Sequence, residues 1–184
     1  DQNPYWRSIW DWAIFAGSLI PALLWGVALA NLIQGVPIDS RMEYTGTFWT
    51  LLSPYTLAGG LAGLAVFILH GAIFLALKAE GPVAVRARKA AGQTGIGAMV
   101  LLLAVTILSY FTTDLFRGFG AVLLMASLIS LVFACFFVRS HNLIRALMAN
   151  GLTIVLAVGA VFAGLFPRVM VSSLNPEWSL TIYN

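Results

Sequence analysis

Residues 55–77 read YTLAGGLAGLAVFILHGAIFLAL, a continuous apolar run without a single Asp, Glu, Lys or Arg. A helix needs about 20 mostly apolar residues to cross the hydrocarbon core of a bilayer. The run also lacks the alternation of apolar and polar residues that a lipid-facing β-barrel strand shows. Residues 55–77 therefore predict a membrane-spanning helix.

Four similar runs lie on either side of it, at residues 12–33, 92–110, 119–138 and 147–166. Pro21 lies inside the first, which predicts a kink because proline removes one helical hydrogen bond. The five runs together predict an all-α integral membrane protein. We expect one polytopic transmembrane helix bundle over residues 1–184, with very little of the chain outside the bilayer.

The composition supports a membrane location and excludes other classes of protein. Hydrophobic residues make up 60% of the chain and charged residues 9%, whereas soluble domains contain about 25% charged residues. The net charge of +3 is small, and the basic residues lie near the ends of the runs rather than in one patch, which argues against a nucleic-acid partner. Cys135 is the one cysteine, so an internal disulfide or a cysteine cluster for a metal is excluded.

The basic residues also predict the orientation, because Lys and Arg collect on the cytoplasmic side of membrane proteins. Seven of them flank one side and three the other. The seven are Arg7, Lys78, Arg86, Arg88, Lys89, Arg139 and Arg145, and the three are Arg41, Arg117 and Arg168. We therefore expect residues 1–10 and a loop over Ala79–Ala91 in the cytoplasm and residues 167–184 outside. We interpret the basic run of that loop as a topology signal rather than a specific site for anionic lipid.

Small residues on the second run predict where helices pack. Gly59 and Gly63 are spaced so that both lie on one helical face, and Gly60 and Gly71 belong to the same run. Small residues let membrane helices approach closely. These four glycines are the candidate helix-packing residues.

The polar residues give few candidates for chemistry. His70 is the one histidine inside a run, and His141 lies beside Arg139. A heme with two histidine ligands is therefore not expected. For His70 we favour a hydrogen bond across the bundle, with a quinone or proton contact as the second interpretation and a His–Met heme as a remote third. Asp114 and Arg117 are expected to form a solvated pair.

Asp11 is the carboxylate closest to a run. It lies at the start of the first run, where it would compensate the helix dipole and pair with Arg7; the alternative is a place on a proton or quinone path. We favour the structural role. The sequence shows no catalytic triad, phosphate loop or metal-ligand spacing, so we predict no catalytic, cofactor-binding or metal site in this chain.

Several motifs in order along the chain resemble subunit II of cytochrome bd-type quinol oxidases. They are the stretch WRSIWDW at residues 6–12, Pro54–Tyr55 with LAGGL at 57–61, HGA at 70–72, and Phe166–Pro167 with SSLNP at 172–176. Residues 111–146 are similar only in general character. The family's acidic motif in its first helix and an Asp–Gly–Asn motif after it are absent from this sequence, so Asp11 is the one acidic family position present.

The resemblance implies a bacterial enzyme of the cytoplasmic (inner) membrane that oxidises quinol and reduces oxygen to water. The family's subunit II is heme-free and pairs with a subunit I that carries the hemes, expected to be heme b and heme d. Membrane lipid, a bound quinone and small accessory single-helix subunits are further candidate partners. The five runs would be helices four to eight of roughly nine, so the chain is expected to be an internal fragment, in agreement with its ends at Asp1 and Asn184.

Two other classes remain open. A secondary transporter would explain five spans and the distribution of basic residues equally well, but not the ordered motifs, and transporter sites usually contain broken helices. A purely structural membrane subunit is the other alternative.

Overall fold

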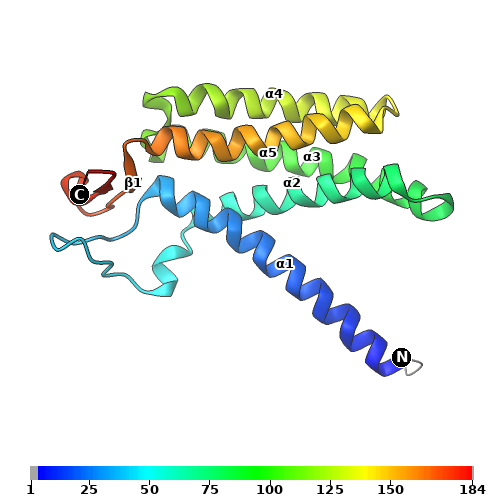
Figure 1. Ribbon diagram of the computed structural model, residues 1–184, viewed down its shortest axis with the longest axis horizontal. Coiled ribbons are helices and arrows are strands. Elements are labelled where there is room, and N and C mark those ends of the chain that lie inside the picture. The colour runs from blue at the N-terminus through cyan, green and yellow to red at the C-terminus, as the bar shows by residue number, and fades with distance from the viewer. Residues whose placement is uncertain (1–3, 184) are drawn as a thin grey trace.

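The computed structural model describes residues 4–183, so the chain ends Asp1 and Asn184 lie outside the described part. Within it, five helices are long and apolar enough to cross a membrane (Figure 1). They are α1 Pro4–Gln34, α2 Pro54–Lys78, α3 Gly81–Thr112, α4 Phe119–Arg139 and α5 Leu143–Leu165. This confirms the predicted all-α multi-pass bundle. α1 runs through Pro21 as one continuous helix.

The prediction of a loop over Ala79–Ala91 was wrong. The connection between α2 and α3 is only Ala79–Glu80, and α3 already begins at Gly81 with a proline in its first turn. Proline is well placed there because its missing N–H has no helical partner to lose, and the Ala- and Arg-rich residues that follow have high helix propensity. Apolar runs mark the part of a helix in the hydrocarbon core, so they miss polar turns that continue the helix beyond it. For the same reason α1 begins before residue 12 and α5 before residue 147.

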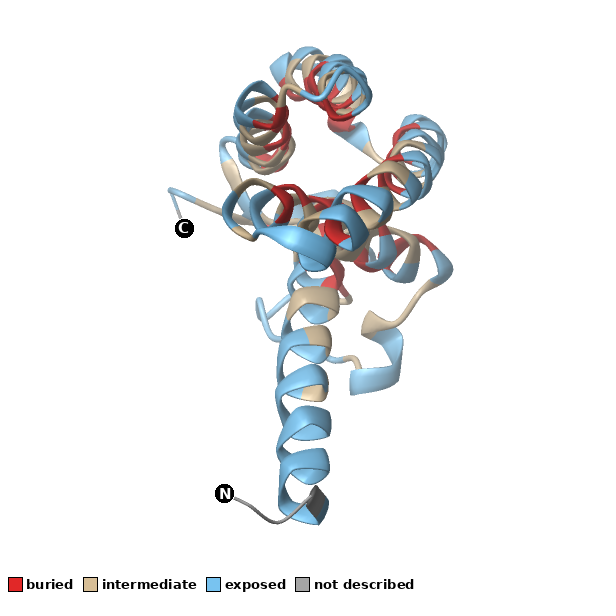
Figure 2. Cartoon of the chain, turned by 90° about the vertical axis from the view of Figure 1, so that its right-hand side faces the viewer, coloured by how far each residue is buried: buried red, intermediate tan, exposed pale blue. Residues whose placement is uncertain are grey.

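Helices that follow one another in sequence pack in pairs, α2 with α3 and α4 with α5 (Figure 1). The core between the two pairs is built from aliphatic side chains of all four helices. The most buried of them are Leu69, Ile73, Ala98, Leu131 and Ala146. Figure 2 shows that the outward faces are exposed, and many of their residues are large and apolar. An apolar exterior is what a bilayer solvates.

α1 leaves the bundle along its N-terminal half (Figures 1 and 2). Residues 5–15 are exposed, and burial begins only near Gly26 and Val27. There α1 crosses α2, and a Cβ added at Gly26 would lie 2.8 Å from the Gly59 carbonyl oxygen and 2.9 Å from the Gly60 Cα. The crossing therefore depends on glycine, because any side chain would separate the two backbones.

The four candidate packing glycines of α2 take different places. A Cβ at Gly59 would lie 2.7 Å from the Ala30 Cβ, and one at Gly60 would lie 2.7 Å from the Val27 side chain. Gly63 is looser, at 3.5 Å from the Gly26 Cα, and a Cβ at Gly71 would meet nothing within 4 Å. Gly59 and Gly60 thus form the crossing with α1, and Gly71 has no part in it.

The C-terminal segment folds into a small cap. Strands β1 Arg168–Met170 and β2 Leu180–Thr181 pair antiparallel, with the short helix η3 Pro176–Trp178 between them. The Ser172 hydroxyl donates to the Ile38 carbonyl oxygen at 2.8 Å. This contact joins the tail to the segment between α1 and α2, which contains the short helix η1 Phe48–Leu51. Hydrogen bonds between residues far apart in sequence make this cap, so no local pattern predicts it.

Candidate functional site

A polar pair joins α2 to α5 inside the bundle. The Asn150 side-chain amide is fully buried and donates to His70 Nδ1 and to the Val66 carbonyl oxygen, each at 3.3 Å. His70 therefore makes the predicted hydrogen bond across the bundle. To accept from Asn150, Nδ1 must be unprotonated, which places the proton of the neutral ring on Nε2.

Two hydroxyls on α4 bond to the backbone of α5 beside Asn150. Ser127 donates to the Thr153 carbonyl oxygen at 3.0 Å and Ser130 to the Ala149 carbonyl oxygen at 2.8 Å. Asn150 Oδ1 is buried and accepts no hydrogen bond from the residues that the structure describes. A buried acceptor without a hydrogen bond costs about 1–3 kcal/mol of stability. A donor to Asn150 Oδ1 would therefore stabilise the core.

The histidines do not fit a heme held by two histidines. His70 lies on α2 in the bundle, and His141 lies in the turn between α4 and α5, where its Nδ1 is 3.0 Å from an Arg88 guanidinium nitrogen. Among the described residues, no three of His, Cys, Asp and Glu gather as a metal site.

Asp11 does not have the structural role that the sequence favoured. α1 begins at Pro4, so Asp11 lies two turns into the helix rather than in its first turn. It is exposed, and it forms no ion pair with Arg7 in the described part of the chain. The expectation of helix-start compensation was therefore wrong, because α1 extends beyond the apolar run that located its start.

An apolar cavity of about 130 Å³ lies where α1, α2, α3 and α5 meet. Trp25, Leu29 and Phe67 are among its lining residues, and Tyr55 and Ser109 supply two of its few polar atoms. These two hydroxyls lie 2.8 Å apart and bond to each other. Such a lining suits an apolar group and offers little to a charged one.

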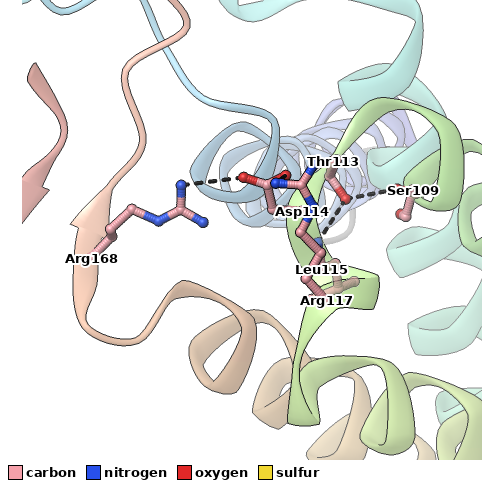
Figure 3. A network of polar contacts seen from close by, with 6 residues as sticks. All are labelled: Ser109, Thr113, Asp114, Leu115, Arg117 and Arg168. Carbon is pink, nitrogen blue, oxygen red and sulfur yellow. Dashed lines mark hydrogen bonds and ion pairs between the residues drawn. The ribbon is translucent and has the colours of Figure 1, made fainter. Parts of the chain in front are cut away.

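At the opposite end of the bundle from the α2–α3 connection, Asp114 links two arginines (Figure 3). It lies in the short helix η2 Asp114–Arg117. Its carboxylate accepts from Arg117 at 3.0 Å, as predicted, and from Arg168 of the tail at 3.5 Å. The Thr113 hydroxyl caps η2 by accepting from the Leu115 N–H. These pairs are each worth about 0–1 kcal/mol. Only the Arg168 pair joins the tail to η2, because the Arg117 pair lies within η2.

Sequence reasoning missed Asn150 and Arg168. Asn150 had a visible signal, since it is an amide within an apolar run beside Gly151, and intramembrane polar residues usually find partners. Arg168 had none, because its partner Asp114 is 54 positions away.

The comparisons with known proteins agree with the fold. The sequence profile of the family described as "Cytochrome bd terminal oxidase subunit II" matches residues 1–184. "Cytochrome bd ubiquinol oxidase subunit 2" of Bacillus subtilis (strain 168) is 36% identical over 182 residues, which are 97% of this chain and 54% of that protein. "Probable cytochrome oxidase subunit 2" of Haemophilus influenzae (strain ATCC 51907 / DSM 11121 / KW20 / Rd) is 30% identical over an alignment covering 100% of this chain and 58% of that protein.

A third relative matches over a shorter region. "Cytochrome bd-I ubiquinol oxidase subunit 2" of Escherichia coli (strain K12) is 39% identical over 103 residues, which are 54% of this chain and 27% of that protein. The chain thus spans little more than half the length of the first two relatives. By its sequence along the whole of residues 1–184, the chain belongs to the cytochrome bd terminal oxidase subunit II family.

Proposed function

We propose that this chain is part of the heme-free membrane subunit of a bd-type terminal oxidase, a complex that oxidises quinol and reduces oxygen to water. The match of the family profile to residues 1–184 carries this proposal. Two relatives are named as ubiquinol oxidases, which supports a quinol as the substrate. Both are named as subunit 2, which implies a partner subunit. The hemes would lie in that partner, subunit I, since the positions of His70 and His141 do not fit a two-histidine site.

The proposal is tested by replacing His70 with leucine in the protein purified together with its partner. We expect every heme band of the reduced-minus-oxidised spectrum to remain. The lost hydrogen bond to Asn150 should cost about 0.6 kcal/mol, the average for membrane-protein hydrogen bonds. His141→Gln, at the exposed end of the bundle, is the control. Loss of one heme band from an intact His70→Leu complex would make this chain a heme-binding subunit, and a purified protein without any heme partner would contradict the proposed function itself.

We propose further that the end of the bundle with the α2–α3 and α4–α5 connections faces the bacterial cytoplasm. The helix ends on either side of both connections and the start of α1 carry the seven basic residues counted above, and positive charge is enriched on the cytoplasmic side. In a Cys135→Ala background, Val85→Cys should resist an impermeant thiol reagent added to intact cells and react in inverted vesicles. Val85 is 70% exposed. Leu174→Cys in the exposed tail should show the opposite pattern, and labelling of Val85→Cys from outside would reverse the assigned orientation.

For Asp11 we propose the second of the two roles, a place on the proton path. The support is its exposed position two turns into α1, at the edge of the apolar run, without an ion-pair partner among the described residues. Asp11→Asn removes the titratable group and keeps the shape. Oxygen consumption at matched heme content should fall tenfold or more, about 1.4 kcal/mol on the barrier. Glu80→Gln in the α2–α3 connection is the control; normal turnover in Asp11→Asn would reject the role.

A further inference from the structure

A groove of about 230 Å³ runs between α3 and α4. On α3 its lining follows helical spacing through Gly92, Ile96 and Met99, and on α4 it follows Val132, Cys135 and Phe136. A Cβ at Gly92 would meet nothing within 4 Å, so the groove is open there. The lining is almost wholly apolar, and Ile96, Val132 and Phe136 are 50–61% exposed, so the groove opens on the outer surface of the bundle.

Both helical stripes end in an arginine at the same end of the bundle. Arg88 precedes Gly92 by four residues, and Arg139 follows Cys135 by four, so each lies on the groove face of its helix. Arg139 lines the groove itself. His141, two residues after Arg139, accepts a hydrogen bond from Arg88 at 3.0 Å. The apolar groove therefore has a cationic end built from both helices.

Neither Arg88 nor Arg139 forms an ion pair within the part of the chain that the structure describes. The ion pairs found there all involve Asp114, at the opposite end of the bundle. Arg88 gives one N–H to His141 and keeps others free, because a guanidinium has five. Arg139 is also the last residue of α4, where its charge interacts favourably with the negative end of the helix dipole. That interaction does not occupy the groove.

We propose that the α3–α4 groove binds an anionic phospholipid, with one acyl chain in the groove and its phosphodiester at Arg88 and Arg139. Guanidinium groups bind phosphate oxygens in bidentate geometry. From Arg88 to Met99 the helix rises about 16 Å, close to half of a hydrocarbon core of about 30 Å. One leaflet's acyl chain thus matches the groove in length, and the charge matches at its end. The sequence suggested only a topology signal here, because it could not place Arg88 and Arg139 on facing helices.

The purified complex in detergent, studied by native mass spectrometry, tests this with two probes, palmitoyl-oleoyl phosphatidylglycerol and the phosphatidylcholine with the same chains. We expect phosphatidylglycerol to be retained preferentially. Arg139→Gln and Arg88→Gln should each weaken its binding about fivefold, from the contribution of one basic residue near a membrane surface. Arg86→Gln, an exposed arginine on the same turns, should have no effect.

A second pair of variants distinguishes the contribution of the groove to lipid binding from that of the headgroup contact. Gly92→Leu should fill the groove and reduce retention of both lipids, whereas Gly97→Leu, equally open but outside the groove, should not. Equal retention of the two lipids by the unmodified complex would overturn the proposal, and so would equal effects of Arg86→Gln and Arg139→Gln. Full competition by free glycerol phosphate would also overturn it, because the acyl chain would then contribute nothing.

Discussion

Gly26→Ala is expected to separate α1 from α2 and to destabilise the protein by about 1–3 kcal/mol, the usual cost of overpacking. The added methyl group would lie 2.8–2.9 Å from backbone atoms of Gly59 and Gly60. Backbone atoms cannot move aside as the end of a flexible side chain can, so the helices themselves must shift. Unfolding in mixed micelles with increasing dodecyl sulfate would measure the change in the free energy of unfolding.

Gly17→Ala is the matched control on the same helix, since a Cβ there meets nothing within 4 Å. Alanine has the higher helix propensity by about 1 kcal/mol, so this variant should be neutral or slightly more stable. The two alanine variants should therefore differ by about 1–4 kcal/mol. If they unfold at the same denaturant concentration, the glycine crossing does not hold α1 in place.

Leu115→Ala should have an effect of similar size at the same end of the bundle, where Leu115 lines the same cavity as Gly26. Leu115 lies in η2, is 3% exposed, and its Cδ1 packs directly against Gly120 and Gly164. Two glycines leave a hollow that this side chain fills, and truncation empties it. Leu→Ala substitutions in cores cost about 2–5 kcal/mol; we expect about 2–3 kcal/mol, because lipid provides no hydrophobic drive to the helix contacts around it.

The control for Leu115→Ala is Leu103→Ala, on the outer face of α3 where the side chain is 49% exposed. That change should cost well under 1 kcal/mol, since no packed neighbours lose their contacts. Thermal unfolding of both variants, with the native protein alongside, gives the comparison. Equal stabilities would mean that the hollow closes around alanine and that Leu115 does not hold η2 on the bundle.

The sequence predicted the helices well because the bilayer fixes their length. A run such as residues 55–77 has one physical interpretation, and α2 extends it by a single residue at each end. The start of α3 could not be read in the same way. Residues 81–91 are helical through propensity and a first-turn proline, which hydropathy does not register.

The candidate sites show the same difference between what a local pattern predicts and what it does not. His70 was identifiable because one imidazole in an apolar run must find a polar partner. Which residue would be that partner depended on how α2 and α5 pack, and the sequence does not contain that information in any local pattern. Asp11 was misplaced because its interpretation depended on a helix boundary, and boundaries are the least certain part of a sequence-based assignment.

The glycine crossing has a mechanical consequence for α1. The helix touches α2 near Gly26, and from there to Tyr5 it extends about 32 Å at 1.5 Å per residue. This part of α1 therefore moves as a rigid rod that pivots at the crossing. A rotation of about 10° at the crossing displaces its N-terminal end by about 5–6 Å, roughly one helical turn. A single methyl group added at the crossing can thus change the position of Asp11 without contacting it.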